Sequence, residues 1–366
     1  MTVKILIGDA LHRLREMEAD SIDCILTSPP YWRQRDYGMP GQIGLEATPE
    51  EYVANLVAVF HEARRVLRAD GTAWITIGDK WASGGLGDGG TFMVAGGHAW
   101  DHARGARGWR KRPAGYKDKD LVGVPFMLAF ALRADGWYWR QCNVWAKPNG
   151  MPESVSDRTT IGHEYVLHLS KSADYWYDAE AVMTAPAAST VTRLRQDVAA
   201  QAGSARAHAG GKINGPMKAV ARRSEKQRGH TRRHEGFNAR WDAMEKSEQM
   251  AMGGNLRSVW WIAPAHFSGA HYAVMPDRLA EICIRAGCPE GGAVLDPFAG
   301  AGTTGLSADR LGRNAVLIEL NHKYVAMARQ RLAADQAARG VRTPASGPIM
   351  CGDDTPLFGS RPSVDG

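Results

Sequence analysis

The sequence contains few cysteines, and none of them is placed to suggest a metal site or a disulfide framework. Among its 366 residues the cysteines are Cys24, Cys142, Cys283, Cys288 and Cys351. They form no CxxC pair and have no companion histidine at the spacing of a zinc site. We therefore predict no bound metal and free thiols, which are typical of a protein in a reducing cytoplasm.

Long apolar runs are also missing from the sequence. No stretch is long enough to cross a bilayer, and the first residues lack the apolar core and cleavage site of a signal peptide. Hydrophobic residues make up an ordinary 44% of the chain, which has room for one large domain or a domain with an insertion. Together these features predict a cytoplasmic globular protein.

Acidic residues are outnumbered by basic ones, 39 against 45, so the formal net charge is +6. Such an excess favours a polyanionic partner, although a basic surface without any specific partner gives the same net charge. The basic residues gather in two segments, a glycine-rich and then basic stretch at 84–119 and a stretch with little apolar periodicity at 186–255. As sets they are typical of phosphate contacts, whereas most single arginines would simply be solvated. The candidates for nucleic-acid contact are Arg107, Arg110, Lys111, Arg112, Arg222, Arg223, Arg232 and Arg233.

Strand and helix signals alternate at both ends of the chain. Short apolar runs at 4–7, 22–27 and 72–77 predict buried strands, and a capping box at 48–51 predicts a helix that Gly71 ends. Further strands are expected at 293–295 and 314–320, each followed by a helix. This alternation predicts an α/β fold with a mostly parallel sheet that helices cover on both faces.

A glycine-rich turn follows one of these strands and opens a helix. Gly300, Gly302 and Gly305 satisfy the GxGxxG pattern, and Glu319 ends the next strand. Glycines let the backbone approach a ligand closely, and an acidic side chain there can hold the hydroxyls of a ribose. The Asp-Pro-Phe triplet at 296–298 adds a carboxylate, which suits a ligand with a cationic amino-acid group, such as S-adenosylmethionine, better than a pyrophosphate. A tight turn without a ligand is the alternative.

A Ser-Pro-Pro-Tyr-Trp loop follows the strand at 22–27. Pro29 and Pro30 end the strand and leave carbonyl groups without local amide partners, while Ser28 offers a hydroxyl and Tyr31 an aromatic face. An extruded nucleobase needs such acceptors for its amino hydrogens and such a ring for stacking. Taken alone, the loop is better explained as a strand terminator with a buried aromatic residue.

The two motifs together resemble those of the DNA amino-methyltransferases. The hallmarks of that family are a (Ser/Asp/Asn)-Pro-Pro-Tyr loop and an Asp-Pro-Phe-x-Gly-x-Gly-Thr-Thr turn, and this chain contains both. Here the loop comes first and the turn last, an order similar to the permuted β-group of the family. Segments at 8–10, 145–149, 163–165 and 271–276 also look familial, so the resemblance extends to about Gly340.

The resemblance implies a Rossmann-like methyltransferase fold with a mostly parallel, seven-stranded, circularly permuted sheet and an inserted target-recognition region. It divides the chain into a catalytic half at 1–185, a target-recognition insertion at 186–255, a cofactor-binding half at 256–340 and a weakly ordered tail at 341–366. The two ends of the chain should then converge on one cleft. S-adenosylmethionine is the implied cofactor and double-stranded DNA the implied partner.

The resemblance also assigns roles to single residues. The loop residues Ser28, Pro29, Pro30 and Tyr31 would be catalytic. The residues implied to contact the cofactor are Asp9, Ala10, His271, Asp296, Phe298, Gly300, Gly302, Thr303, Thr304 and Glu319.

The implied reaction is methyl transfer to an exocyclic amino nitrogen of a flipped-out base. Methylation at a ring carbon would need a cysteine on the loop, and the chain contains no Pro-Cys dipeptide. Serine at the first loop position resembles the cytosine-N4 enzymes, whereas aspartate or asparagine is commoner among the adenine-N6 enzymes. We therefore predict a site-specific cytosine-N4 DNA methyltransferase, with adenine N6 as the alternative.

Interpretations of other classes stay open at this point. A nicotinamide-dependent oxidoreductase could use the glycine turn but would leave the Ser28 loop and the basic insertion unexplained. A non-catalytic DNA-binding relative and an RNA methyltransferase are two more. The resemblance places the protein in a bacterial, archaeal or phage context, associated with the nucleoid. The target sequence, a homodimeric state and a cognate restriction endonuclease are not read from the sequence.

Overall fold

The computed structural model describes residues 1–82, 114–150, 152–186, 253–265 and 274–340, with a few isolated positions between 191 and 248. The chain divides into two compact units, residues 1–178 with 257–366 and residues 179–256. Of the second unit the structure describes little beyond the short 3-10 helix η2 (Glu180–Val182) and a bridge between Thr184 and Gly254. Most of the predicted loop at 84–119, and the whole tail at 341–366, lie outside the described residues.

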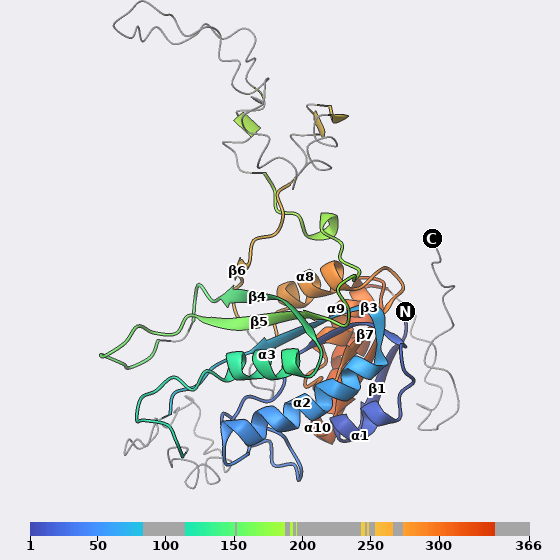
Figure 1. Ribbon diagram of the computed structural model, residues 1–366. Helices are drawn as coiled ribbons and strands as arrows, with labels where there is room; N and C mark the ends of the chain where they lie inside the picture. Colours follow the sequence, from blue (N-terminus) through green and yellow to red (C-terminus); the bar gives the residue numbers. More distant parts are fainter. Residues whose placement is uncertain are drawn as a thin grey trace, which may run out of the picture. The chain divides into compact units, whose positions relative to one another are not determined.

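The first unit is built on one mixed sheet with the strand order β1-β8-β7-β2-β3-β5-β4-β6 (Figure 1). Only the pairings of β5 with β3 and with β4 are antiparallel. The strands are β1 (Val3–Ile7), β2 (Ile22–Thr27), β3 (Leu67–Ile77), β4 (Tyr138–Ala146), β5 (His163–Ser170), β6 (Val259–Trp261), β7 (Ala293–Asp296) and β8 (Asn314–Glu319).

Among the described residues the sheet has eight strands, one more than the predicted seven. The additional strand is β6, which has three residues and lies parallel to β4 at the edge of the sheet. Val259 and Trp261 are exposed on either side of the buried Trp260. Three residues that directly follow a segment without apolar periodicity are too few to carry a recognisable alternating pattern.

Helices form a layer on each face of the sheet (Figure 1). On one face α2 packs against α1 and α3, and on the other α9 packs against α8 and α10. Their bounds are α1 (Ala10–Arg15), α2 (Pro49–Val66), α3 (Val124–Ala134), α8 (Asp277–Gly287), α9 (Thr303–Arg310) and α10 (His322–Ala338). None of the described helices is long and apolar enough to span a bilayer.

The start of α2 confirms the predicted capping box, whereas its predicted end was wrong. Thr48 accepts from the Glu51 amide and Glu51 accepts from the Thr48 amide. The helix ends at Val66, and Gly71 lies inside β3 instead of closing the helix. A Cβ at Gly71 would lie 2.6 Å from the Leu67 side chain and 2.9 Å from the Asp23 carbonyl oxygen. Glycine is therefore needed there because β2 and β3 approach closely.

Strands from the two ends of the chain lie side by side, as the predicted permutation requires. β1 runs parallel to β8, with Val3 beside Ala315 and Ile7 beside Glu319. β7 lies between β8 and β2, and Cys24 of β2 pairs with Val294. The carboxyl ends of these four strands consequently share one edge of the sheet, where open α/β sheets bind their ligands.

The glycine turn after β7 is shaped in part by helix packing. Gly302 adopts φ +78°, which disfavours any residue with a side chain. A Cβ at this position would lie 2.7 Å from the Cβ of Ala328 in α10. Because the side chain of Ala328 is a single methyl group without alternative rotamers, α10 itself would have to shift. The glycine thus lets α10 lie against the start of α9.

We expect Gly302→Ala to lower the free energy of unfolding by about 1–3 kcal/mol, because it combines an unfavourable φ with a clash against α10. Ser307→Ala on the same helix is the matched control. The Ser307 hydroxyl is buried and has no hydrogen-bond partner among the described residues, so its removal should leave stability unchanged or slightly higher. Urea denaturation of both variants tests this. Equal stability of Gly302→Ala and the parent protein would contradict it.

Candidate active site

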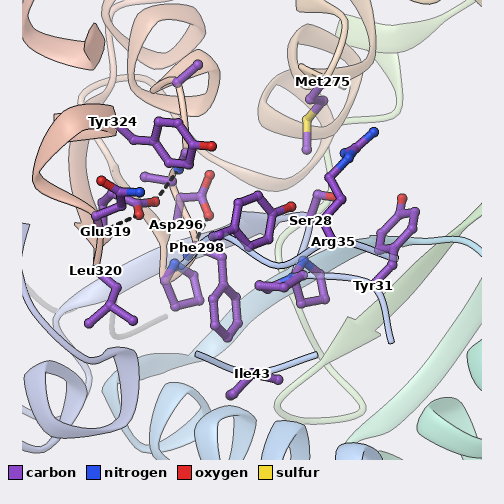
Figure 2. A pocket seen from close by; sticks show the side chains of 18 of the residues that line it. Ser28, Tyr31, Arg35, Ile43, Met275, Asp296, Phe298, Glu319, Leu320 and Tyr324 are labelled. Atoms are coloured by element: carbon purple, nitrogen blue, oxygen red, sulfur yellow. Dashed lines mark hydrogen bonds between the residues drawn. The ribbon is translucent and has the colours of Figure 1, made fainter. Parts of the chain in front are cut away.

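Both sequence motifs line one cavity of about 230 Å³ at the carboxyl ends of the strands. Figure 2 shows Ser28, Tyr31 and Arg35 on one side and Glu319, Leu320 and Tyr324 on the other, with Asp296 and Phe298 between them. The predicted residues that line the cavity are Asp9, Ala10, Ser28, Pro29, Pro30, Tyr31, Asp296, Phe298, Gly300, Thr303, Thr304 and Glu319. The predicted convergence of the two ends of the chain is thus present in the structure.

The other predicted residues either do not line this cavity or lie outside the described residues. Gly302 does not line it, and its conformation is explained by the contact with Ala328. His271 lies outside the described residues. The eight predicted DNA contacts also lie outside them: Arg107, Arg110, Lys111, Arg112, Arg222, Arg223, Arg232 and Arg233.

Asp296 is a buried carboxylate held in one orientation at the end of β7. Its Oδ1 accepts from the Thr27 hydroxyl at 2.6 Å and from the Phe298 amide at 3.0 Å, and its Oδ2 accepts from the Thr304 hydroxyl at 2.6 Å. Burial raises the pKa of Asp296 to about 6, although these hydrogen bonds act in the opposite direction. An ionised Asp296 is therefore costly in the described structure, and a cationic group docked beside it would relieve that cost.

Glu319 is a second acidic group in the same part of the cavity. Its Oε2 accepts from the Gly300 amide at 2.8 Å and its Oε1 from the Asn321 amide at 2.7 Å. Burial raises the pKa of Glu319, while the backbone hydrogen bonds lower it. In a pyrophosphate site the glycine amides would point at the phosphates, but here Gly300 donates to a carboxylate. The turn therefore suits a ligand without phosphate.

The Ser28 loop is held by contacts to the surrounding helices and strands. The Tyr52 hydroxyl of α2 donates to the Pro30 carbonyl at 2.8 Å, so this carbonyl already has a donor. The Trp32 indole nitrogen donates to the Glu46 carbonyl at 3.1 Å. Ser28 and Pro29 remain at the cavity wall, where their oxygens can accept from a ligand. The loop is fixed on its helix side and presents acceptors to the cavity.

Sequence reasoning missed several residues that line the cavity. Thr76 of β3 is one of them, and its buried hydroxyl has no hydrogen-bond partner among the described residues. Glu164 of β5 and Lys147, which follows β4, form an ion pair at the wall. The sequence marks the segments at 145–149 and 163–165 only by their family resemblance. Nothing in them indicates that Glu164 accepts from the Tyr31 hydroxyl, because that contact depends on the tertiary structure.

Two further aromatic residues also line the cavity. Tyr37 and Tyr324 meet edge to face with ring centroids 6.1 Å apart, and both line the cavity. Tyr37 belongs to the segment after the Ser28 loop and Tyr324 to the first turn of α10. The contact links the segment after the Ser28 loop to the helix that follows β8. A single aromatic residue in a loop gives no sequence signal for such a pairing.

Comparisons with known proteins agree with this geometry. A family model described as DNA methylase matches residues 22–330. The chain is 37% identical to the Type II methyltransferase M.SmaI of Serratia marcescens, with 90% of each chain covered. It is 39% identical to the Type II methyltransferase M.Cfr9I of Citrobacter freundii, with 90% of this chain and 87% of that relative covered.

Solved structures show the same fold at low sequence identity. The PvuII DNA methyltransferase, described as cytosine-N4-specific, has a TM-score of 0.53 at 17% identity, with 92% of each chain covered. TTHA0409 of Thermus thermophilus, described as a putative DNA modification methylase and complexed with S-adenosyl-L-methionine, has a TM-score of 0.50 at 22% identity. That match covers 91% of this chain and 96% of the other.

Asp296→Asn is expected to change how stability depends on pH. Because the folded-state pKa of Asp296, about 6, lies above its ordinary value of 3.8, charging this group destabilises the fold. As the pH rises from about 4 to about 6, the wild-type protein should lose on the order of 2–3 kcal/mol relative to the variant. Denaturant unfolding at several pH values measures this difference.

Asp335→Asn provides a control of opposite sign. Hydrogen bonding to Arg310 lowers the pKa of Asp335. The wild-type protein should therefore keep its advantage over this variant above about pH 4 and lose it as the pH falls further. A pH-independent difference between wild type and Asp296→Asn would contradict the assignment of a raised pKa to Asp296.

Proposed function

Because the chain belongs to the DNA methylase family, we propose that it transfers a methyl group from S-adenosylmethionine to the exocyclic N4 of a cytosine flipped out of double-stranded DNA. The observation that carries the proposal is the shared cavity. The Ser28–Tyr31 loop and the Asp296–Thr304 turn lie at opposite ends of the sequence, yet both line it. Donor and acceptor can therefore meet there.

The acidic end of the cavity fits S-adenosylmethionine. This cofactor carries an ammonium group and a ribose diol but no phosphate, which matches the buried Asp296 and the half-buried Glu319, two carboxylates with raised pKa values. Asp296 would hold the cationic amino-acid part and Glu319 the ribose hydroxyls, with Asp9 and Phe298 at the cavity wall. When bound, S-adenosylmethionine supplies an electrophilic methyl group attached to a positively charged sulfur.

The Ser28 end of the cavity would bind the extruded base. Flipping a base out of the duplex costs a few kcal/mol, and stacking on an aromatic ring such as Tyr31 returns about 1–3 kcal/mol. The Ser28 hydroxyl and the Pro29 carbonyl would accept the two amino hydrogens, which frees the nitrogen lone pair for attack. Since these groups act by holding the amino nitrogen in place, positioning would supply most of the acceleration.

Cytosine N4 is the proposed target because Ser28 opens the loop, and adenine N6 is the alternative. Methylation at a ring carbon is disfavoured by the state of Cys24. That thiol is fully buried within β2, and burial raises its pKa, so it is not a reactive nucleophile. A nicotinamide site is disfavoured because the Gly300 amide donates to Glu319 instead of facing a pyrophosphate.

DNA binding is proposed to involve two basic segments, most of whose residues lie outside the described ones. The insertion at 186–255 would recognise the target sequence, and the basic residues at 104–119 would lie near the extruded base. The phosphate contacts made by such sets depend on counterion release. Affinity for DNA should accordingly fall steeply as the salt concentration rises.

The methylated base tests the proposal directly. Genomic DNA treated with the protein and S-adenosylmethionine would be digested to nucleosides and analysed by mass spectrometry. We expect N4-methylcytosine. N6-methyladenine would select the alternative base, and 5-methylcytosine or the absence of any methylated nucleoside would refute the amino-methyltransferase assignment.

Ser28→Ala and Tyr31→Ala should each lower kcat for methyl transfer by on the order of a hundredfold, because the first removes an acceptor for the amino group and the second the stacking surface. Both should bind S-adenosylmethionine within a few-fold of wild type, since neither residue lies at the acidic end of the cavity. Single-turnover transfer of a labelled methyl group and calorimetric titration measure the two properties. Full transfer activity in both variants would eliminate the mechanism.

A further inference from the structure

The register of the sheet places several polar and aromatic residues on one face beside Tyr31. Thr76 of β3 pairs with Val166 of β5, and Glu164 of β5 pairs with Trp145 of β4. Directly paired residues, and residues two positions apart on one strand, project to the same side of a sheet. Thr76, Glu164 and Trp145 therefore share a face, and all three line the cavity.

Glu164 contacts the catalytic loop from this face. The Tyr31 hydroxyl donates a hydrogen bond to Oε2 of Glu164 at 2.6 Å, and Nζ of Lys147 donates one to Oε1. Lys147 also lies over the Trp145 ring, 4.5 Å from its centroid. The side chains of Lys147 and Glu164 are only about one-fifth exposed, at 21% and 18%. Because water screens them little, these charge-assisted contacts are stronger than surface ones.

The phenol of Tyr31 stays a hydrogen-bond donor in this environment. Burial raises the pKa of Tyr31 well above its ordinary value, and the negative charge of Glu164 raises it further. The Tyr31 hydroxyl therefore keeps its proton and donates a hydrogen bond to Glu164. The orientation of the ring is fixed at its far end by this contact.

The edge of the Tyr31 ring is confined as well. A Cβ at Gly78, just beyond β3, would lie 2.9 Å from Cε2 of Tyr31 and 3.6 Å from Cγ of Glu164. The ring thus occupies space that exists only because residue 78 lacks a side chain. One contact constrains the hydroxyl and the other constrains the ring edge, and they involve different atoms.

We infer that Glu164 is a positioning residue that orients the Tyr31 ring for stacking on the extruded base, with Lys147 as its counter-charge. The inference rests on the proposed role of Tyr31. A ring already held in its stacking orientation loses no rotational freedom when the base arrives, so more of the stacking energy remains available for extrusion. Lys147 balances the carboxylate, which would otherwise be an unpaired charge at the cavity wall.

A double-mutant cycle between Glu164→Gln and Tyr31→Phe tests the inference, because Phe keeps the ring and removes only the hydroxyl. Glu164→Gln should lower kcat on the order of tenfold or more and leave KM for S-adenosylmethionine unchanged. In the Tyr31→Phe background the same substitution should lower kcat less than twofold. A loss in that background as large as in wild type, or no loss in wild type, would overturn the inference.

Gly78→Ala separates ring position from the hydroxyl contact. Since its methyl group displaces the ring edge, it should lower kcat in both the wild-type and the Tyr31→Phe backgrounds.

Glu62→Gln is the matched control for Glu164→Gln, because Glu62 also accepts from a cation, Arg65 at 2.7 Å, but does not line the cavity. It should stay within twofold of wild type. If Glu164→Gln fails to fold because Lys147 is left unpaired, the double variant Lys147→Met/Glu164→Gln replaces it in the cycle.

A fluorescence readout separates this inference from the proposed function. DNA with 2-aminopurine at the target position reports stacking of the extruded base, whichever base is methylated in natural DNA. Complexes with Glu164→Gln should show less quenching by Tyr31 than wild-type complexes, and the difference should vanish in the Tyr31→Phe background. Quenching that is equal in wild type and Glu164→Gln would count against positioning even if methyl transfer occurs as proposed.

Discussion

The parallel pairing of β2 with β7 is the contact on which the site depends. β2 carries the Ser28 loop at its end and β7 carries the Asp296 turn, and the two strands come from opposite ends of the chain. Their junction is reinforced beyond the backbone ladder by the hydrogen bond from Thr27 to Asp296, which joins residues 269 positions apart. Without this pairing neither motif could act on a ligand held by the other.

The neighbouring pairing of β7 with β8 determines the charge distribution of the cavity. Asp296 and Glu319 end neighbouring strands, β7 and β8, so two carboxylates lie close enough that the charge of Asp296 adds to the raised pKa of Glu319. The fold compensates with hydroxyl and amide donors, which orient both groups without cancelling their charge. A cationic ligand would therefore supply the positive charge that these donors do not provide. Perturbed carboxylates of this kind are characteristic of a binding site and make little sense as a device for stability.

Sequence reasoning identified the motifs because each is local. The Ser28 loop and the Asp296 turn are recognisable from proline, glycine and strand ends within about ten residues, and so is the capping box at Thr48. The packing of Gly302 could not be read from the sequence, because its neighbour, Ala328, belongs to a helix that the pattern cannot place against it. β6 was missed because a strand of three residues is too short to show an alternating pattern of apolar and polar residues. Local signals thus give the chemistry, while packing partners need the tertiary structure.

The contacts around Tyr31 are an example of packing partners that the sequence does not indicate. Glu164 reaches the ring because β5 runs antiparallel between β3 and β4, which places the amino end of β5 at the cavity. Gly78 reaches the ring because it follows the carboxyl end of β3, which is parallel to β2. A parallel β5 would direct the amino end of that strand, where Glu164 lies, to the other edge of the sheet. The antiparallel segment therefore does more than complete the sheet. It supplies the side chains that hold the aromatic ring, whereas the parallel strands supply the ring itself and the acidic groups.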